Sequence, residues 1–433
     1  MSQLSRSQPI QPEDDRSLST PRRSGRVLVL GTDQRVILAV ARSLGRQGLA
    51  VELGWCAPQA PATRSRYVVR THTIPAYARD DDRWKCVLLD LLDRETYDLV
   101  IPCNDSTLVP LIAHRSDFDR FPEIYVLPDN VFSIVSDKFK TYELAVAQSV
   151  NVPRGFVVDA TADPSRLIDV LGLPIVLKPQ STFTVRNRDL ANVVCKARDR
   201  DELRSQLERL GLTPCLAQQS FGGRGVGVEM LVRQGEILFA FQHERLHESM
   251  EWGSSYRRSV AVQPELLDAS RRMMRAIGYT GVAMAEYMVD HDSGRWVFLE
   301  INGRFWGSLP LAVAAGADFP WFLYQMLVEG RRDFDPAYRL GVRCRNLSLD
   351  LDWIKRTYAG DGWRRLGLPL GLALQLVSAA THLDHWDTFS LDDPSPQWSE
   401  LRAILKRRLG RSADRQLPEL PQPESACETT AVG

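Results

Sequence analysis

The chain has 433 residues, enough for two or three domains, and 44% of them are apolar, as in ordinary globular proteins. Lysine plus arginine and aspartate plus glutamate both number 54, so the charge balance favours neither a nucleic acid nor an acidic membrane surface as partner. We therefore expect small molecules as partners.

The cysteines are scattered without a CxxC pair and the histidines are not clustered, so neither a zinc site nor a disulfide framework is indicated. This pattern predicts a reducing, cytoplasmic location. Residues 1–24 lack the apolar segment of a signal peptide, and no later run has the length of a membrane span. Because residues 1–24 and 411–433 are rich in Ser, Pro and charge, we expect both to be disordered tails.

Apolar runs at 26–30, 50–53, 97–105 and 123–129 follow one another at the spacing of strand-helix units. A helical pattern between the first two runs ends at Gly48. Strands that are apolar throughout indicate a parallel sheet covered on both faces, an α/β arrangement.

Two features of this first part have alternative interpretations. The sequence GTDQR after the first strand is either a structural turn or a phosphate loop, since it lacks the GxGxxG spacing. Asp105 follows the strand YDLVIPCN, at the sheet edge where α/β proteins bind ligands, but it would serve equally as a helix N-cap.

From about residue 131 the strands pair as hairpins with helices between them, which indicates an α+β unit. We predict helices over 133–150 and 264–279 and a strand that ends at Lys178 and Pro179. Two hairpins are expected, one around RQGE and one around DHDSG.

The second hairpin contains the most informative motif, FLEINGRFWGSL. Side chains two residues apart point to the same face of a strand, so Glu300, Asn302 and Arg304 project together if the strand continues that far. Glu286 lies across the hairpin. Two carboxylates and an amide oxygen suit Mg²⁺, and Arg304 would supply a cation for a phosphoryl group. A solvated polar face is the alternative, although the apolar neighbours favour a buried strand.

Two lysines precede this motif. Lys178 ends an apolar strand, where its ammonium group would emerge toward a ligand, and Lys138 lies near the start of a helix. Taken alone, each is more commonly a solvated surface residue.

The order of these parts resembles the ATP-grasp superfamily, in its carbamoyl-phosphate-synthetase-like and carboxylate-amine ligase branch. The parts are, in chain order, Lys138, Lys178, a hinge-like CLAQQSFGGRGVGVEMLV, Glu286 and the Glu300-x-Asn302-x-Arg304 segment. The resemblance covers roughly residues 26–330. It implies a Rossmann-like domain at 25–130 and a two-subdomain ATP-grasp fold at 131–330, with a hinge near 218–223. We expect residues 331–410 to form a helical extension without assigned chemistry.

The resemblance also implies roles for individual residues. Lys138 and Lys178 would contact the ATP phosphates, Lys178 and Arg304 would act in catalysis, and Mg²⁺ or Mn²⁺ would be the metal cofactor. The metal ligands would be Glu286, Glu300 and Asn302. The hinge residues expected to contact the nucleotide are Gln218, Gln219, Ser220 and Phe221, with Glu229 as a ribose contact.

The chain departs from the family pattern at two places. Gln219 stands where the family hinge usually has Glu, and a neutral amide still accepts a hydrogen bond. The loop after Lys178, PQSTFTVRNRD, has no glycine, whereas the superfamily often uses glycine there to close backbone N–H groups over the phosphates. Ser181, Thr182 and Arg186 are alternative donors.

The polar stretch 241–260, FQHERLHESMEWGSSYRRSV, would be a solvated loop if it stood alone. In similar ATP-grasp proteins this region lies beside the γ-phosphate and the carboxylate substrate. We therefore predict carboxylate-binding roles for Arg245, Ser254, Ser255 and Arg258, because the guanidinium fork binds a carboxylate with two parallel hydrogen bonds.

The preferred interpretation is an ATP-dependent ligase that joins a small carboxylate to an amine through an acylphosphate and releases ADP and phosphate. The alternatives are a carboxyphosphate-forming carboxylase or carbamoyl-phosphate-synthetase-like enzyme, and a nucleotide-binding regulatory module without turnover. The sequence leaves the oligomeric state open, a homodimer being one option.

Overall fold

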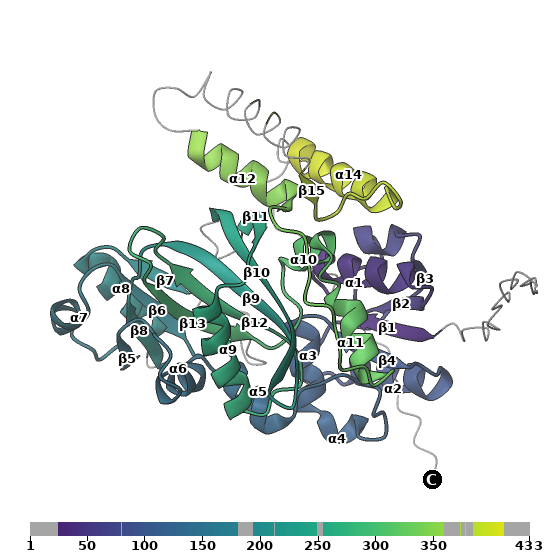
Figure 1. The fold of residues 1–433 in the computed structure, drawn as a ribbon, viewed down its shortest axis with the longest axis horizontal. Helices are drawn as coiled ribbons and strands as arrows, with labels where there is room; N and C mark the ends of the chain where they lie inside the picture. The colour runs from purple at the N-terminus through teal and green to yellow at the C-terminus, as the bar shows by residue number, and fades with distance from the viewer. Residues whose placement is uncertain are drawn as a thin grey trace, which may run out of the picture.

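The computed structural model describes residues 25–410 except for 79, 181–193, 212, 249–253 and most of 359–383, where only 373 and 377 are described. Three β-sheets form this part of the chain, and they follow one another across the molecule (Figure 1). The purple N-terminal sheet lies at one end, a small sheet at the other end, and a seven-stranded sheet between them. Within the described residues, no helix is long and apolar enough to cross a membrane.

The N-terminal sheet is parallel, with the strand order β3-β2-β1-β4. Its strands are β1 (Arg26–Leu30), β2 (Ala50–Gly54), β3 (Val68–His72) and β4 (Leu99–Pro102). Helices α1 (Gln34–Arg46), α2 (Arg83–Arg94), α3 (Asp105–Ala113) and α4 (Arg115–Phe118) and the short 3-10 helix η1 (Pro61–Arg64) surround it. Val27 and Val29 pack into one core with α1, while Leu28 and Leu30 pack into another with Trp84 of α2. The predicted parallel sheet covered on both faces is confirmed.

One strand prediction in this sheet is wrong, and one strand was not predicted. The run 123–129 makes only a single bridge, from Ile124 to Val100, and forms no named strand. The edge strand β3 was not predicted, because its sequence VVRTH is mostly polar and exposed, so it carries no buried apolar pattern.

The small sheet is antiparallel, with the order β5-β8-β6-β7. Its strands are β5 (Gly155–Val158), β6 (Ile175–Pro179), β7 (Cys195–Ala197) and β8 (Cys215–Gln219), and its helices are α7 (Pro164–Leu171) and α8 (Arg200–Leu210). Ile175 and Leu177 of β6 pack against these helices. Because neighbouring residues of a strand face opposite sides, Val176 and Lys178 face away from the helices, toward the rest of the molecule.

The central sheet has the order β13-β12-β9-β10-β11-β14-β15. Its strands are β9 (Arg224–Arg233), β10 (Glu236–Glu248), β11 (Ser254–Val260), β12 (Gly281–Val289), β13 (Trp296–Asn302), β14 (Arg343–Arg345) and β15 (His385–Trp386). Both predicted hairpins are present, β9–β10 around the turn RQGE and β12–β13 around DHDSG. One face of the sheet packs on α9 (Pro264–Ala276), and the other packs on α10 (Leu309–Ala315) and α11 (Phe319–Leu327).

The predicted helix 133–150 is two helices, α5 (Asp129–Val135) and α6 (Lys138–Ala147). The break occurs because the Asp137 side chain accepts hydrogen bonds from the backbone N–H groups of Phe139 and Lys140, at 2.9 and 3.2 Å, and so caps α6. Lys138 is therefore the first residue of a helix rather than part of a continuous one.

The segment after residue 330 is more than a helical extension. It contains α12 (Leu347–Tyr358) and α14 (Ser395–Gly410), but β14 and β15 also extend the central sheet. These strands have three and two residues, too short to show a periodic pattern in the sequence.

Asp393, just before α14, joins this segment to the N-terminal domain. Its carboxylate accepts hydrogen bonds from Arg42 Nε (2.9 Å), Ser65 Oγ (2.7 Å) and the backbone N–H of Arg66 (2.9 Å). Asp393 is 1% exposed and Arg42 5% exposed. Burial lowers the pKa of Arg42, and the hydrogen bond that Arg42 donates to Asp393 offsets this only in part.

We predict that Asp393→Ala lowers the free energy of unfolding by about 3–5 kcal/mol, because it leaves the buried Arg42 guanidinium without its counter-ion. Chemical denaturation followed by circular dichroism measures this change. The neighbouring Asp392 is a matched control, since its ion pair with Arg46 is exposed (37% and 40%), and Asp392→Ala should cost at most about 1 kcal/mol. Equal losses in the two variants would contradict the assignment.

Candidate active site

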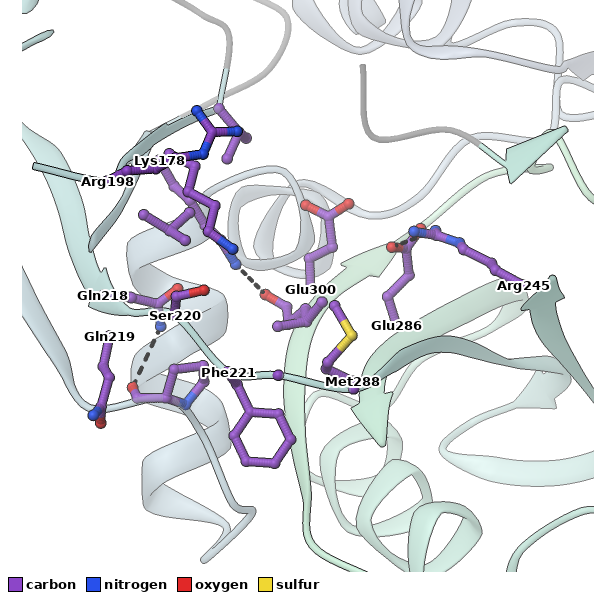
Figure 2. A pocket seen from close by; sticks show the side chains of 17 residues that line it. Lys178, Arg198, Gln218, Gln219, Ser220, Phe221, Arg245, Glu286, Met288 and Glu300 are labelled. Carbon is purple, nitrogen blue, oxygen red and sulfur yellow. Dashed lines mark hydrogen bonds and ion pairs between the residues drawn. The ribbon is translucent and has the colours of Figure 1, made fainter. Parts of the chain in front are cut away.

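Two neighbouring cavities share one wall. The larger, of about 470 Å³, lies between the small sheet and the central sheet, and the smaller, of about 200 Å³, extends toward α10. Arg245, Glu286 and Glu300 line both cavities. Figure 2 shows the larger one, with Lys178 of β6 on one side and Glu286 and Glu300 of the central sheet on the other.

The shared wall depends on the register of β12 and β13. Glu286 stands directly opposite Glu300, and Leu299 is an extra residue because Tyr287 already pairs with Phe298. This β-bulge explains why Phe298 and Ile301, three residues apart, both pack on the α9 side of the sheet. The predicted convergence of Glu286 and Glu300 across the hairpin is therefore seen in the structure.

Both carboxylates have cationic partners. Lys138 Nζ lies 2.6 Å from Glu300 Oε2, and Arg245 Nη2 lies 2.8 Å from Glu286 Oε2. Asn302 Nδ2 donates to Glu286 Oε1 at 3.2 Å. Burial by itself would raise the pKa of Glu300, but the charges of Lys138 and Lys178 outweigh it and lower the pKa to about 2. Glu300 is therefore an anion at neutral pH.

Lys178 enters the larger cavity from the opposite side. It is 7% exposed, and its Nζ donates to the carbonyl oxygen of Leu299, the bulged residue, at 3.4 Å. Burial lowers the pKa of Lys178 to about 8, although the charge of Glu300 opposes that effect.

The hinge residues Gln218, Gln219, Ser220 and Phe221 all line the larger cavity. The backbone N–H groups of Gln219 and Ser220 donate within the protein, to Arg154 O and Pro174 O, so they position the segment. Gln218 Nε2 reaches Pro153 O at 3.5 Å, whereas its buried Oε1 has no hydrogen-bond partner. Gln218 thus offers an acceptor oxygen beside the cavity.

Arg304 lies beyond the end of β13, so it does not share the strand face with Glu300 and Asn302. It is held instead by Asp105, whose Oδ2 accepts from Arg304 Nε (3.1 Å) and Nη2 (3.0 Å). Asp105 is the first residue of α3 and Asn104 its N-cap. Burial would lower the pKa of Arg304, but the charge of Asp105 outweighs it and raises the pKa.

The four predicted carboxylate-binding residues divide into two groups. Arg245 and Ser254 line the smaller cavity, while Ser255 and Arg258 do not. Ser255 Oγ donates to Asp350, and Arg258 pairs with Glu244. The structure therefore places Ser255 and Arg258 outside the lining of this cavity, away from Arg245 and Ser254. The stretch 241–260, taken alone a solvated loop, is mostly the strands β10 and β11.

The position of Arg258 outside the cavity follows from the register of β11. Arg257 stands opposite Arg245 in the β10–β11 pairing and lines the smaller cavity, so its neighbour Arg258 faces the other side of the sheet. The sequence contains both arginines side by side and gives no indication of which one faces inward.

Glu229, the predicted ribose contact, also lies outside the lining of the larger cavity. Glu229 is fully buried and does not line the larger cavity. Its Oε1 accepts from Ser308 Oγ at 2.7 Å and lies 2.9 Å from His243 Nδ1. Glu229 lies behind the smaller cavity, which both Ser308 and His243 line.

Several residues that line the two cavities were not predicted from the sequence. Lys196 and Arg198, around the end of β7, line the larger cavity, and Arg35, at the start of α1, lines the smaller one. The turn GTDQR is a helix cap, since the Asp33 side chain accepts from the backbone N–H of Arg35 at 3.0 Å. The basic residue that ends GTDQR was the available signal for Arg35. Ser181, Thr182 and Arg186 lie outside the described residues.

The donor set suits Mg²⁺ in the form it takes beside phosphates. Within the described ranges, no group of three His, Cys, Asp or Glu side chains could hold a metal alone. Glu286, Glu300 and the amide oxygen of Asn302 supply two carboxylates and one neutral oxygen. Mg²⁺ is commonly bound by one or two carboxylates together with substrate phosphates and water, so these residues fit it.

Residues 212–348 match the model of a family described as "ATP-grasp in the biosynthetic pathway with Ter operon". The chain is also 26% identical over 186 residues to a D-alanine–D-alanine ligase from Bordetella petrii. Residues 212–348 are therefore similar to an ATP-grasp family. The match to the ligase covers 39% of this chain and 55% of the relative, about half of its length.

Solved structures show the same fold. An L-amino acid ligase from Bacillus licheniformis has a TM-score of 0.53 at 17% identity, covering 70% of this chain and 74% of that one. The biotin carboxylase domain of 2-oxoglutarate carboxylase from Hydrogenobacter thermophilus was solved with MgADP and bicarbonate. It has a TM-score of 0.59 at 15% identity, and the match covers 73% of each chain. N5-carboxyaminoimidazole synthetase from Staphylococcus aureus, solved with ADP, has a TM-score of 0.55 at 15% identity. The match covers 74% of this chain and 80% of that one.

We predict that the affinity of the protein for ATP falls as the pH rises through about 8. Lys178 is protonated below its lowered pKa and neutral above it, and a neutral amine loses its attraction for a phosphate. Losing one charge-assisted contact should weaken binding roughly tenfold or more.

Titration calorimetry with ATP between about pH 7 and 9.5 measures this dependence, because binding to the free protein reports the pKa values of the free protein. Lys178→Met should bind weakly without a transition near pH 8. Lys140→Met, at an exposed position on α6, should retain the transition. A wild-type affinity that is constant over this range would contradict the role of Lys178.

Proposed function

We propose that the chain is an ATP-dependent ligase that joins a small carboxylate to an amine through an acylphosphate and releases ADP and phosphate. The observation that supports this most directly is the wall between the two cavities. The Glu286 and Glu300 carboxylates face both spaces. A phosphate from one side and a carboxylate from the other would meet at this wall.

In this proposal the larger cavity holds ATP. The hinge residues and the free Oε1 of Gln218 would contact the adenine, and Lys138 and Lys178 would contact the phosphates. Glu286, Glu300 and Asn302 would hold Mg²⁺ or Mn²⁺, which neutralises phosphate charge when bound. The departure at Gln219 leaves an exposed amide that still lines the cavity.

Arg304 would stabilise the phosphoryl group as it moves to the substrate carboxylate. Asp105 keeps its guanidinium in place through Nε and Nη2, which leaves Nη1 on the other side of the group. Nη1 donates to the carbonyl oxygen of Phe305 at 2.9 Å. Phosphoryl transfer depends mainly on positioning and on stabilisation of charge, so no nucleophile from the protein is required.

The substrate carboxylate would lie in the smaller cavity near Arg245 and Ser254. Ser254 Oγ donates to backbone carbonyls of His247 and Tyr256, so its hydroxyl oxygen can still accept a hydrogen bond. The amine would then attack the acylphosphate from the same cavity. The ligase names of the Bordetella petrii and Bacillus licheniformis proteins support this class of reaction.

The test is isotope transfer from the substrate carboxylate. Carboxylic acids labelled with ¹⁸O, supplied with ATP, Mg²⁺ and a pool of amino acids, should give inorganic phosphate that contains one ¹⁸O atom, because the acylphosphate passes one carboxylate oxygen to phosphate when the amine displaces it. Mass spectrometry of the released phosphate gives the result. Release of ADP only with bicarbonate would support a carboxyphosphate-forming enzyme instead, and ATP binding without ADP release from any mixture would support a regulatory module.

We predict that Glu300→Gln and Asn302→Ala each lower Mg²⁺-dependent ADP release roughly hundredfold or more, which corresponds to about 3 kcal/mol of transition-state stabilisation. Both residues are partly exposed in a cavity, so the thermal unfolding midpoint should change little. Asp292→Asn, in the exposed turn between β12 and β13, is the control and should keep the wild-type rate. An unchanged rate in Glu300→Gln would remove the metal assignment.

A further inference from the structure

The smaller cavity is strongly cationic. Four arginines line it together with His243, against only two carboxylates, Glu286 and Glu300. These arginines are Arg35, Arg245, Arg257 and Arg304. Three of them have acidic partners, Asp33, Asp387 and Asp105, and none of these partners lines the cavity. The acids therefore hold the arginines from outside the cavity lining, and the arginines give the cavity surface a positive charge.

The positions of the arginines along the cavity differ. Arg245 lines both cavities, so it lies at the wall where phosphate and carboxylate would meet. Arg304 would also act there in the proposed reaction. Arg35 and Arg257 line only the smaller cavity. One reacting carboxylate at the shared wall therefore leaves Arg35 and Arg257 available for a different anion.

Arg257 has binding capacity that the protein does not use. It is 1% exposed, its Nη1 donates to the carbonyl oxygen of Gly307 at 2.9 Å, and its Nη2 pairs with Asp387. Its Nε and the Nε1 of Trp306, another lining residue, are buried without hydrogen-bond partners. Each such donor costs about 1–3 kcal/mol when it is left unpaired. Both residues line the smaller cavity, and these two donors have no partner within the described part of the chain.

Arg35 reaches the cavity from the N-terminal domain. Asp33 holds it through two contacts, Nε to Oδ1 (3.2 Å) and Nη2 to Oδ2 (2.9 Å). Its guanidinium lies over the backbone of Gly307, where an added Cβ would come within 3.0–3.2 Å of three guanidinium atoms. Burial would lower the pKa of Arg35, but the charge of Asp33 outweighs it, so the side chain stays protonated.

We propose that the carboxylate substrate carries a second anionic group, a carboxylate or a phosphate, and that Arg35 and Arg257 bind this group in the smaller cavity. The proposal rests on the ligase function given above and specifies its substrate class. The cavity, of about 200 Å³, suits a small dianion.

Binding of two matched pairs of compounds to the full chain, in the presence of MgADP, tests the proposal. Succinate is compared with its neutral-ended analogue succinamate, and O-phospho-L-serine with L-serine. Titration calorimetry should give at least about tenfold tighter binding for one dianion than for its partner, because an arginine-carboxylate or arginine-phosphate contact is charge-assisted. The pair with the larger ratio identifies the anion as a carboxylate or a phosphate.

Variants assign the effect to Arg35. Arg35→Gln should weaken the preferred dianion at least about tenfold while leaving the affinity of its neutral partner unchanged, and Gly307→Ala should act in the same direction by displacing the guanidinium without removing its charge. Arg46→Gln, on the same helix but paired with Asp392 outside the cavity, is the matched control and should bind like the wild type. Thermal unfolding of each variant confirms that the fold is retained.

The failure of this inference is distinguishable from failure of the ligase function. Three results would overturn the inference. They are equal binding of each dianion and its neutral partner, no binding of any of the four compounds, and an equal loss of affinity for both members of a pair in Arg35→Gln. Arg35-dependent binding of a dianion without ADP release from any carboxylate would uphold the inference and remove the ligase function. ADP release with monocarboxylates, together with equal binding of dianions and their neutral partners, would uphold the ligase function and remove the inference.

Discussion

Two carboxylates of like charge, Glu286 and Glu300, stand directly opposite each other on neighbouring strands, and the rest of the site depends on this contact. Like charges at such positions are destabilising unless cations lie close by. The chain supplies them from different elements: Lys138 from the start of α6, Lys178 from the end of β6 and Arg245 from β10. The capped helix and the small sheet thus both deliver positive charge to one point of the central sheet.

The N-terminal domain takes part in this site through individual side chains. Asp105 at the start of α3 holds Arg304, and Asp33 at the start of α1 holds Arg35. Both acids follow strands of the parallel sheet, at the carboxyl edge where such sheets commonly bind ligands. Here that edge positions arginines of a neighbouring cavity. The domain therefore holds one arginine of the smaller cavity, Arg304, through Asp105 and supplies another, Arg35.

Much of the fold follows from patterns that the sequence displays openly. Continuous apolar strands predicted the parallel sheet, and the turns RQGE and DHDSG predicted both hairpins. The alternation in FLEIN, with Glu286 across the hairpin, indicated that Glu300 and Glu286 would meet. The short strands β14 and β15 and the exposed edge strand β3 have no such pattern, because they depend on tertiary pairing.

The site was predicted less completely than the fold, for reasons of register. The choice between Arg257 and Arg258 depends on the pairing of β10 with β11, which contains bulges, and a shift by one residue exchanges the two faces. Glu229 lies on a strand of the central sheet but behind the smaller cavity, away from the larger one. Arg35 is far from the other site residues in the sequence and reaches them only through packing of the N-terminal domain against Gly307.

The pairing of Arg257 with Asp387 has a consequence for the order in which the protein is made. The two residues are 130 positions apart, and both are almost fully buried. During synthesis from the N-terminus, the sheet that carries Arg257 emerges long before its counter-ion. A buried cation without a partner is strongly unfavourable. The smaller cavity therefore reaches its final form only after the segment that contains Asp387 has left the ribosome, so the substrate site is among the last parts of the molecule to be completed.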